Sequence, residues 1–173
     1  MNVLEAIQNR REVTNFQDKK IPEETLEKVL EAAFLSPSGN HLPSREFILT
    51  VKRETMDQLV HTTPFVPWLR EAAAAIVVTG RPEISKYWLQ DASIACGFIW
   101  LSAVEQGLGA AFGAVYHSED PNESKKRESF VRKQLLILDD RRIVAIMGLG
   151  YPKGEPKPKK LLSRNEIIRY DHF

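Results

Sequence analysis

Residues 87–106 read YWLQDASIACGFIWLSAVEQ, the longest run in the chain with a single unbroken pattern. Its apolar residues recur at helical spacing and cover most of the circumference: Leu89, Ala92, Ala95, Cys96, Ile99, Trp100, Ala103 and Val104. We therefore predict a long helix from about Tyr87 to Gln106, which Gly107 ends. Such a helix is buried, either inside the subunit or against a second copy. In this setting Cys96 is expected to be a small apolar side chain rather than a nucleophile.

Shorter elements are predicted on both sides of this helix. The expected strands are Glu46–Val51, Ala75–Thr79, Ala110–Val115 and Arg142–Met147, and the expected helices include Glu54–Val60 and Glu128–Leu136. Asn2 and Glu5 favour a capped first helix, and Pro22 favours the start of a second. The turn at 36–39 ends that second helix, because proline disfavours helix before it and Gly39 permits a left-handed turn. Helices and strands mix without strict alternation, which indicates an α+β fold.

Composition narrows the class of protein. The chain has 173 residues, so we expect one domain over 1–173. Its 24 Lys and Arg nearly balance its 23 Asp and Glu, so no overall positive charge favours the binding of nucleic acid. The single cysteine excludes an intrachain disulfide. Neither a signal-peptide pattern nor an apolar stretch of membrane length is visible, so we expect a cytoplasmic protein without membrane contact. The four histidines lack metal spacing, and we predict no metal site.

The end of the chain is basic. The segment 151–160 holds three prolines and four lysines and is predicted to run as an extended arm. The last residues include six apolar anchors: Leu161, Leu162, Ile167, Ile168, Tyr170 and Phe173. A tail of this kind is rarely ordered unless it is docked. It packs either on its own subunit or on another copy of the chain.

Four short elements follow one another in a fixed order along nearly the whole chain. They are Arg10-Arg11 leading to Phe16; Ser36-Pro37-Ser38-Gly39-Asn40; Asp91 with the apolar run that closes on Gly107-Leu108-Gly109; and Ile143 to Met147 running into Gly148-Leu149-Gly150-Tyr151-Pro152 and the lysine-rich tail. This ordered set resembles the FMN-dependent nitroreductase family. The resemblance implies an α+β fold with a mixed central sheet flanked by helices. It also implies a homodimer with FMN sites at the interface and the C-terminal arm, 151–173, lying over the partner.

The resemblance assigns the FMN phosphate to Arg10 and Arg11, together with Lys159 or Lys160. Arginine forks bind phosphate oxygens in pairs, so the residue type suits the task. Taken alone, an arginine pair at a helix end more often faces water. Lysines of a basic tail are also usually solvated, and the sequence does not choose between the two.

Two positions depart from the family pattern. Glu12 stands where serine is usual, and Thr14 stands where a cation is usual. In the family that cation faces flavin N1 and O2 and stabilises the reduced flavin electrostatically. Thr14 offers a neutral hydroxyl, so either another cation replaces it, such as Arg45 or a residue of the partner, or reduction is less favoured here.

Further cofactor contacts are implied by the loop and by small residues at strand ends. They are Pro37, Ser38, Gly39, Asn40, His41, Phe112, Gly113, Gly148 and Gly150. Small residues let backbone approach the flavin ring. A plain turn between helix and strand would also explain the loop, and a helix cap followed by a core strand would explain much of the rest. We assign no catalytic side chain, although His41 is a candidate acid or base by residue type.

The activity implied by the resemblance is electron transfer from NAD(P)H through FMN to a small acceptor such as a nitroaromatic, a quinone or an enone. The protein would position and tune the flavin, which carries the chemistry. Two alternatives stay open. One is an FMN-binding module or sensor with little turnover, and the other is a non-flavin dimeric scaffold whose basic arm contacts a partner.

Overall fold

A four-stranded antiparallel sheet forms the centre of the computed structural model, which describes residues 1–173. Its strands are β1 (Arg45–Thr50), β2 (Ala74–Gly80), β3 (Gly109–Ala114) and β4 (Arg142–Gly150), in the order β1-β2-β4-β3. Parallel pairing occurs at one isolated bridge, between Ala110 of β3 and Glu12, which lies outside the four strands. The α+β class is confirmed. The sheet was predicted to be mixed, and this bridge is its one parallel pairing.

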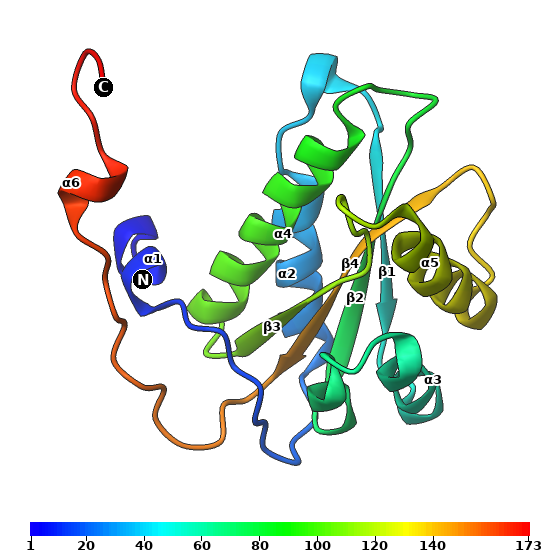
Figure 1. Cartoon of the computed structure of the whole chain (residues 1–173). Helices are drawn as coiled ribbons and strands as arrows, with labels where there is room; N and C mark the ends of the chain where they lie inside the picture. Colours follow the sequence, from blue (N-terminus) through cyan, green and yellow to red (C-terminus); the bar gives the residue numbers. More distant parts are fainter.

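Helices cover both faces of the sheet (Figure 1). The helices of the chain are α1 (Val3–Asn9), α2 (Glu23–Phe34), α3 (Arg53–Leu59), α4 (Trp88–Glu105), α5 (Pro121–Leu135) and α6 (Arg164–Ile167), with short 3-10 turns η1 (Gly39–His41), η2 (Val60–Thr62) and η3 (Pro67–Arg70). Helices α2 and α4 lie on one face, and α3 and α5 lie on the other.

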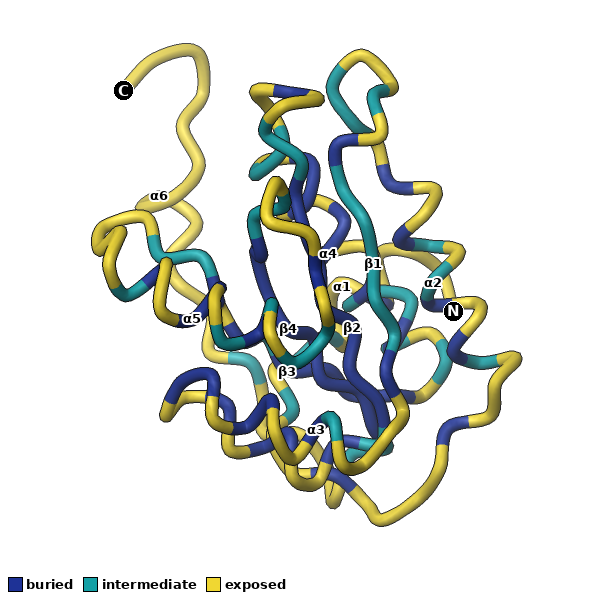
Figure 2. Tube along the Cα trace, turned by 90° about the vertical axis from the view of Figure 1, so that its right-hand side faces the viewer, coloured by how far each residue is buried: buried dark blue, intermediate teal, exposed yellow.

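The core therefore has two parts, one on each side of the sheet. Along β2, Ile76 and Val78 face α2 and α4, whereas Ala75 and Val77 face the other layer. Every residue of β2 is buried, as the dark central strands in Figure 2 show. A strand covered on both faces is apolar throughout, which is why this segment has no polar alternation.

Most predicted elements are present, and two differ in extent. The cap of α1 is confirmed: the Glu5 amide donates to Asn2 Oδ1 and the Asn2 amide donates to Glu5 Oε2. Helix α5 begins at Pro121 rather than Glu128, because Asp120 accepts from two amides of the first turn. Strand β4 continues to Gly150 instead of ending at Met147.

The prediction that Gly39 adopts a left-handed conformation in the loop after α2 is wrong. The left-handed residues there are Asn40 and His41, with φ of 56° and 55°, not Gly39. A Cβ on Gly39 would instead lie 2.6 Å from Cδ2 of Tyr87, so close packing excludes a side chain. Gly107 has φ of 73° and ends α4 as predicted.

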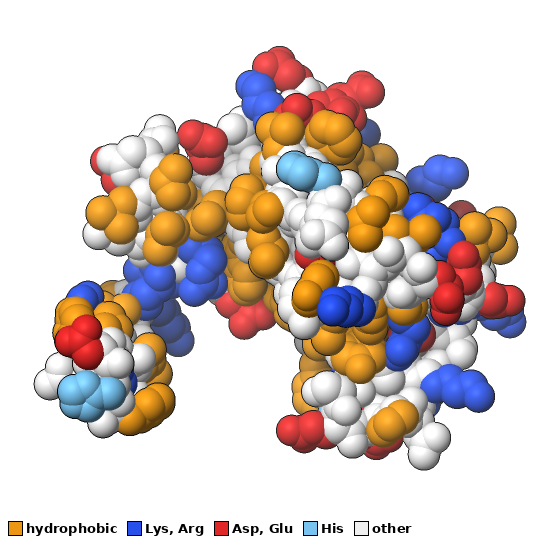
Figure 3. All heavy atoms as spheres, turned by 90° about the horizontal axis from the view of Figure 1, so that it is seen from above, with side chains coloured by type: hydrophobic (Ala, Val, Ile, Leu, Met, Phe, Trp, Pro, Cys, Tyr) orange, Lys and Arg blue, Asp and Glu red, His pale blue; other side chains and the backbone are white.

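The C-terminal arm leaves the main body as an extended chain, as predicted for 151–160. It passes α1 and ends in a separate lobe that contains the single turn α6 (Figures 1 and 3). All six apolar anchors of the tail are exposed in the single chain. No helix of the structure has the length and apolarity that a membrane crossing would require. Cys96 is buried, and burial raises the pKa of its thiol to about 12, which agrees with an apolar role.

Candidate functional site

The segment Arg10–Phe16, called the arginine segment below, runs along the open edge of β3. The Val13 amide donates to the Ala110 carbonyl at 3.0 Å, and Phe16 bridges to Pro152 at the start of the arm. A Cβ on Gly109 would lie 2.6 Å from Val13, so a small residue is required where the two backbones meet. The arginine segment is thus held between the sheet edge and the arm.

Three cations gather at the beginning of this segment. The Arg11 Nε donates to the Lys157 carbonyl at 3.0 Å, and Lys159 Nζ donates to the Ile7 carbonyl at 2.9 Å. None of Arg10, Arg11 and Lys159 forms an ion pair with a carboxylate. The pKa of Lys159 is lowered by partial burial and by the charges of Arg10 and Arg11. Positive charges that repel one another without a carboxylate favour the binding of a multiply charged anion.

Of the two late lysines, the structure brings Lys159 to this cluster. Lys160 is exposed and makes no hydrogen bond or ion pair. Figure 3 shows Lys and Arg side chains gathered between the lobe of the tail and the main body. The sequence did not separate these neighbours because alternate residues of an extended chain point in opposite directions, and the direction depends on the docking of the arm.

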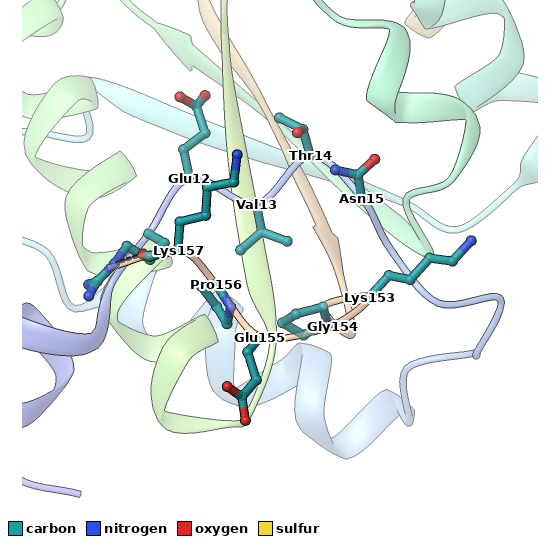
Figure 4. Close-up of a pocket in the computed structure, with 11 residues that line it drawn as sticks. Glu12, Val13, Thr14, Asn15, Lys153, Gly154, Glu155, Pro156 and Lys157 are labelled. Atoms are coloured by element: carbon teal, nitrogen blue, oxygen red, sulfur yellow. Dashed lines mark hydrogen bonds between the residues drawn. The ribbon is translucent and has the colours of Figure 1, made fainter. Parts of the chain in front are cut away.

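A pocket of about 500 Å³ lies between the arginine segment and the arm (Figure 4). It is lined by Arg11, Glu12, Val13, Thr14, Asn15, Pro152, Lys153, Gly154, Glu155, Pro156 and Lys157. Besides Arg11, the cations that share this pocket with Thr14 are Lys153 and Lys157, both from the arm. Arg45 lies elsewhere and donates to the carbonyl of Ser36, so within one chain it does not replace the missing cation.

Glu12 contacts the outer edge of β3. The amide of Phe112 donates to Glu12 Oε1 at 3.4 Å, and in Figure 4 the carboxylate points away from the arm. The Glu12 side chain is exposed and forms no ion pair. A carboxylate therefore occupies a backbone donor on the sheet edge where the sequence predicted a cofactor contact.

Trp100 connects several predicted site residues, although sequence reasoning had placed it among the core positions of the long helix. Its Nε1 donates to the Arg11 carbonyl at 3.0 Å, and its ring stacks on Phe112 with centroids 6.4 Å apart. The Arg10 guanidinium lies over the same ring, 4.6 Å from its centroid. A buried tryptophan usually needs a hydrogen-bond partner for its indole N–H. That requirement was the one indication in the sequence that Trp100 does more than fill the core.

The second group of predicted residues lies in the loop Ser36–Ser44, called the α2–β1 loop. It sits at the other end of α4 from the arginine segment (Figure 1). The carboxylate of Asp91 accepts from the Gly39 amide at 3.0 Å and from Ser44 Oγ at 2.5 Å. Asp91 and Trp100 are nine residues apart on α4, about 13.5 Å along its axis. Pro37, Ser38, Gly39, Asn40 and His41 are therefore not brought together with Arg10 within one chain.

Three other predicted cofactor contacts are glycines, and packing inside the protein explains why these positions hold no side chain. A Cβ would lie 2.5 Å from Val66 at Gly113, 2.3 Å from Trp68 at Gly148 and 2.6 Å from Phe16 at Gly150. Core packing alone therefore excludes a larger residue at these positions. Cofactor contact by their backbone stays a prediction.

Comparison with known proteins places these features in context. The family model described as the nitroreductase family matches residues 7–63. A protein of Methanothermobacter thermautotrophicus, provisionally named NADH dehydrogenase/NAD(P)H nitroreductase, is 32% identical over 170 residues, which cover 96% of this chain and 86% of the relative.

Two solved structures cover almost all of the chain. A crystal structure from Parabacteroides distasonis, with the same provisional name, has a TM-score of 0.90 and 30% identity, with all of both chains covered. An FMN-dependent nitroreductase from Clostridium difficile has a TM-score of 0.89 and 27% identity, covering 98% of this chain and 99% of that one.

Proposed function

This chain belongs to the nitroreductase family, and from that premise we propose that it is an NAD(P)H-dependent oxidoreductase with FMN as its cofactor. Relatives named as NAD(P)H nitroreductases and a structural neighbour named as FMN-dependent support both parts of the proposal. The observation in this chain that carries it is the cluster of Arg10, Arg11 and Lys159 without a carboxylate partner. The acceptor we propose is a small oxidant such as a nitroaromatic, a quinone or an enone.

The residues present fit FMN at its charged end. Burial first, and then repulsion by Arg10 and Arg11, lowers the pKa of Lys159. A phosphate carries close to two negative charges, and binding it would offset that repulsion. The Arg10 guanidinium pairs with no carboxylate and lies over the Trp100 ring. The stacked rings of Trp100 and Phe112 offer a flat apolar surface beside this cluster.

When bound, FMN supplies the hydride and electron chemistry of the family. The side chains of this protein bind and orient it. Arg10, Arg11 and Lys159 would hold the phosphate. The charge of the adjoining pocket comes from Lys153 and Lys157 together with Glu12 and Glu155. No side chain has to act as a nucleophile, so we propose no catalytic residue.

We also propose that a second copy of the chain completes the site, so that 1–173 forms one domain whose arm, 151–173, docks on the partner. The α2–β1 loop and the arginine segment lie at opposite ends of α4, and a partner can bring a loop to each arginine segment. Ile94 and Phe98 on α4 are 44% and 40% exposed in the single chain. A groove of about 600 Å³ beside Phe98, between α1, α2 and α4, offers apolar surface for a partner. We further propose that the protein is cytoplasmic, as its sequence predicted.

The phosphate site is tested with Arg10→Ala, with Lys160→Ala as the matched control from the same basic region. Loss of a charge-assisted hydrogen bond costs about 1.5–3 kcal/mol, so FMN affinity should fall by about tenfold or more in the Arg10 variant. Lys160→Ala should bind FMN like the unmodified protein, because the Lys160 side chain is exposed and makes no hydrogen bond or ion pair. Equal FMN retention by both variants after dialysis would contradict the assignment.

A flavin-binding sensor with little turnover is the second candidate. Thr14 and Glu12, which replace a cation and a neutral residue of the family pattern, favour it. The two functions separate by spectroscopy: an enzyme loses its flavin absorbance with NADH or NADPH and regains it with a quinone, whereas a sensor does so slowly or not at all. A colourless protein that takes up no FMN would support the scaffold instead.

A further inference from the structure

Asp91 is a buried carboxylate on the first turns of α4, with 4% of its surface exposed. Both of its hydrogen-bond donors come from the α2–β1 loop: the Gly39 amide and the Ser44 hydroxyl. No Lys, Arg or His forms an ion pair with it. A buried carboxylate without a cation is an expensive way to stabilise a fold, because only two neutral donors and the N-terminal end of α4 offset its desolvation.

The loop that Asp91 holds is strained and displays polar groups. Asn40 and His41 both adopt left-handed backbone, which residues other than glycine adopt rarely and keep only where their surroundings enforce it. Their side chains are exposed and make no hydrogen bonds. Strain of this kind, next to free polar side chains, is typical of segments that present groups to a ligand.

The two anchor points fix the loop from both sides of the strained turn. Gly39 lies just before Asn40, and a Cβ there would collide with Tyr87, so the backbone is pressed against α4. Ser44 lies after it, is fully buried, and its carbonyl accepts from the Arg81 amide at 2.7 Å. A single carboxylate thus ties the strained residues to a rigid helix at two places.

We propose that Asp91 is a positioning residue, which holds the α2–β1 loop in one conformation so that Ser38, Asn40 and His41 are presented to the flavin. The flavin part rests on the function proposed above, whereas the fixing of the loop does not. The geometry of the carboxylate matters more here than its contribution to stability, because its donors all belong to the presenting loop.

The experiment compares Asp91→Asn and Ser44→Ala with Glu128→Gln. Glu128 is an equally buried carboxylate, 4% exposed, that bonds Ser124, the Ile143 amide and Arg142, none of which belongs to the α2–β1 loop. Three quantities are measured in each variant: hydrogen exchange of the Gly39 amide in the flavin-free protein, the FMN dissociation constant from quenching of flavin fluorescence, and the melting temperature.

Asp91→Asn should speed exchange at Gly39 and weaken FMN binding, each by about tenfold, the loss of one good hydrogen bond. Ser44→Ala should move both in the same direction by about threefold, because the Gly39 bond remains. Glu128→Gln should lower the melting temperature and leave both loop quantities unchanged. If Asp91→Asn does not fold, the Ser44 variant decides by the same two measurements.

The inference fails if Asp91→Asn lowers the melting temperature as Glu128→Gln does while exchange at Gly39 and FMN affinity stay unchanged. Faster exchange at Gly39 with unchanged FMN affinity overturns the flavin part, because the loop then moves without consequence for binding. If the unmodified protein binds no FMN, the proposed function fails, and exchange at Gly39 still decides whether Asp91 fixes the loop.

Discussion

The arginine segment and the α2–β1 loop are both anchored on α4, but by different means. The arginine segment is held by bonds spread along its length, including Val13 to the Ala110 carbonyl and Trp100 to the Arg11 carbonyl. The link between the loop and α4 depends on one buried carboxylate, Asp91, which accepts from both Gly39 and Ser44. Many small contacts tolerate the loss of any one, whereas a single charged anchor does not. The difference teaches that the two halves of the proposed site will respond unequally to single substitutions.

The largest difference between the two regions is expected when the chain is ended after Tyr151. Truncation removes the Phe16–Pro152 bridge, the bond from the Lys153 amide to the Asn15 carbonyl, and Lys159. The arginine segment then loses one of its two walls, and we expect loss of FMN binding together with aggregation through uncovered apolar surface. Flavin absorbance and light scattering measure these outcomes.

In the soluble fraction of the truncated protein, the Gly39 amide should still exchange slowly, because Asp91 is untouched. A monomeric protein that keeps its FMN would show that the arm neither joins subunits nor holds the phosphate. Fast exchange at Gly39 would mean that the two regions are not independent.

Trp100→Leu comes next. It removes a hydrogen bond to the Arg11 carbonyl and a cation–π contact with Arg10, together about 1–2 kcal/mol, so FMN affinity should fall by a factor of about 5–30. The matched control is Trp88→Leu at the other end of the same helix, where the ring meets Tyr116 edge-on at 5.4 Å. Equal loss of affinity in both variants would indicate a general loosening of α4 rather than an effect on the arginine segment.

The sequence predicted the two halves of the site unequally. Local signals fixed much of the fold, including the cap at Asn2 and the long apolar helix that became α4. Lys159 was not separable from Lys160, because the direction of each side chain depends on how an extended arm docks. Asp91 and Trp100 lay inside a helix assigned by periodicity, and their partners in the α2–β1 loop and the arginine segment are more than 45 residues away in the chain. Such contacts have no local signature. Family membership was readable because it rests on the order of short elements rather than on these contacts.

A smaller effect is expected when the arginine segment gains a cation. Thr14→Lys should raise the two-electron reduction potential of bound FMN, because positive charge favours the added electrons. Full stabilisation by ~2.8 kcal/mol would correspond to ~60 mV, since 30 mV equals about 1.4 kcal/mol for two electrons. Thr14 is exposed and already shares its pocket with Lys153 and Lys157, so water and these charges should reduce the shift to about half or less. An unchanged potential, measured with FMN still bound, would mean that position 14 does not face the ring.

The smallest effect concerns the protonation of Lys159. In the flavin-free protein its pKa lies below the ordinary value of lysine, because partial burial and the neighbouring Arg10 and Arg11 disfavour its charge. A bound phosphate favours that charge and raises the pKa, so binding takes up a proton wherever the free side chain is partly neutral. FMN affinity should therefore be highest at neutral pH and should fall as the pH rises through the lowered pKa of Lys159. Lys159→Arg should bind FMN without this decline, since arginine stays protonated. A decline that persists in the arginine variant would assign the titration to another group.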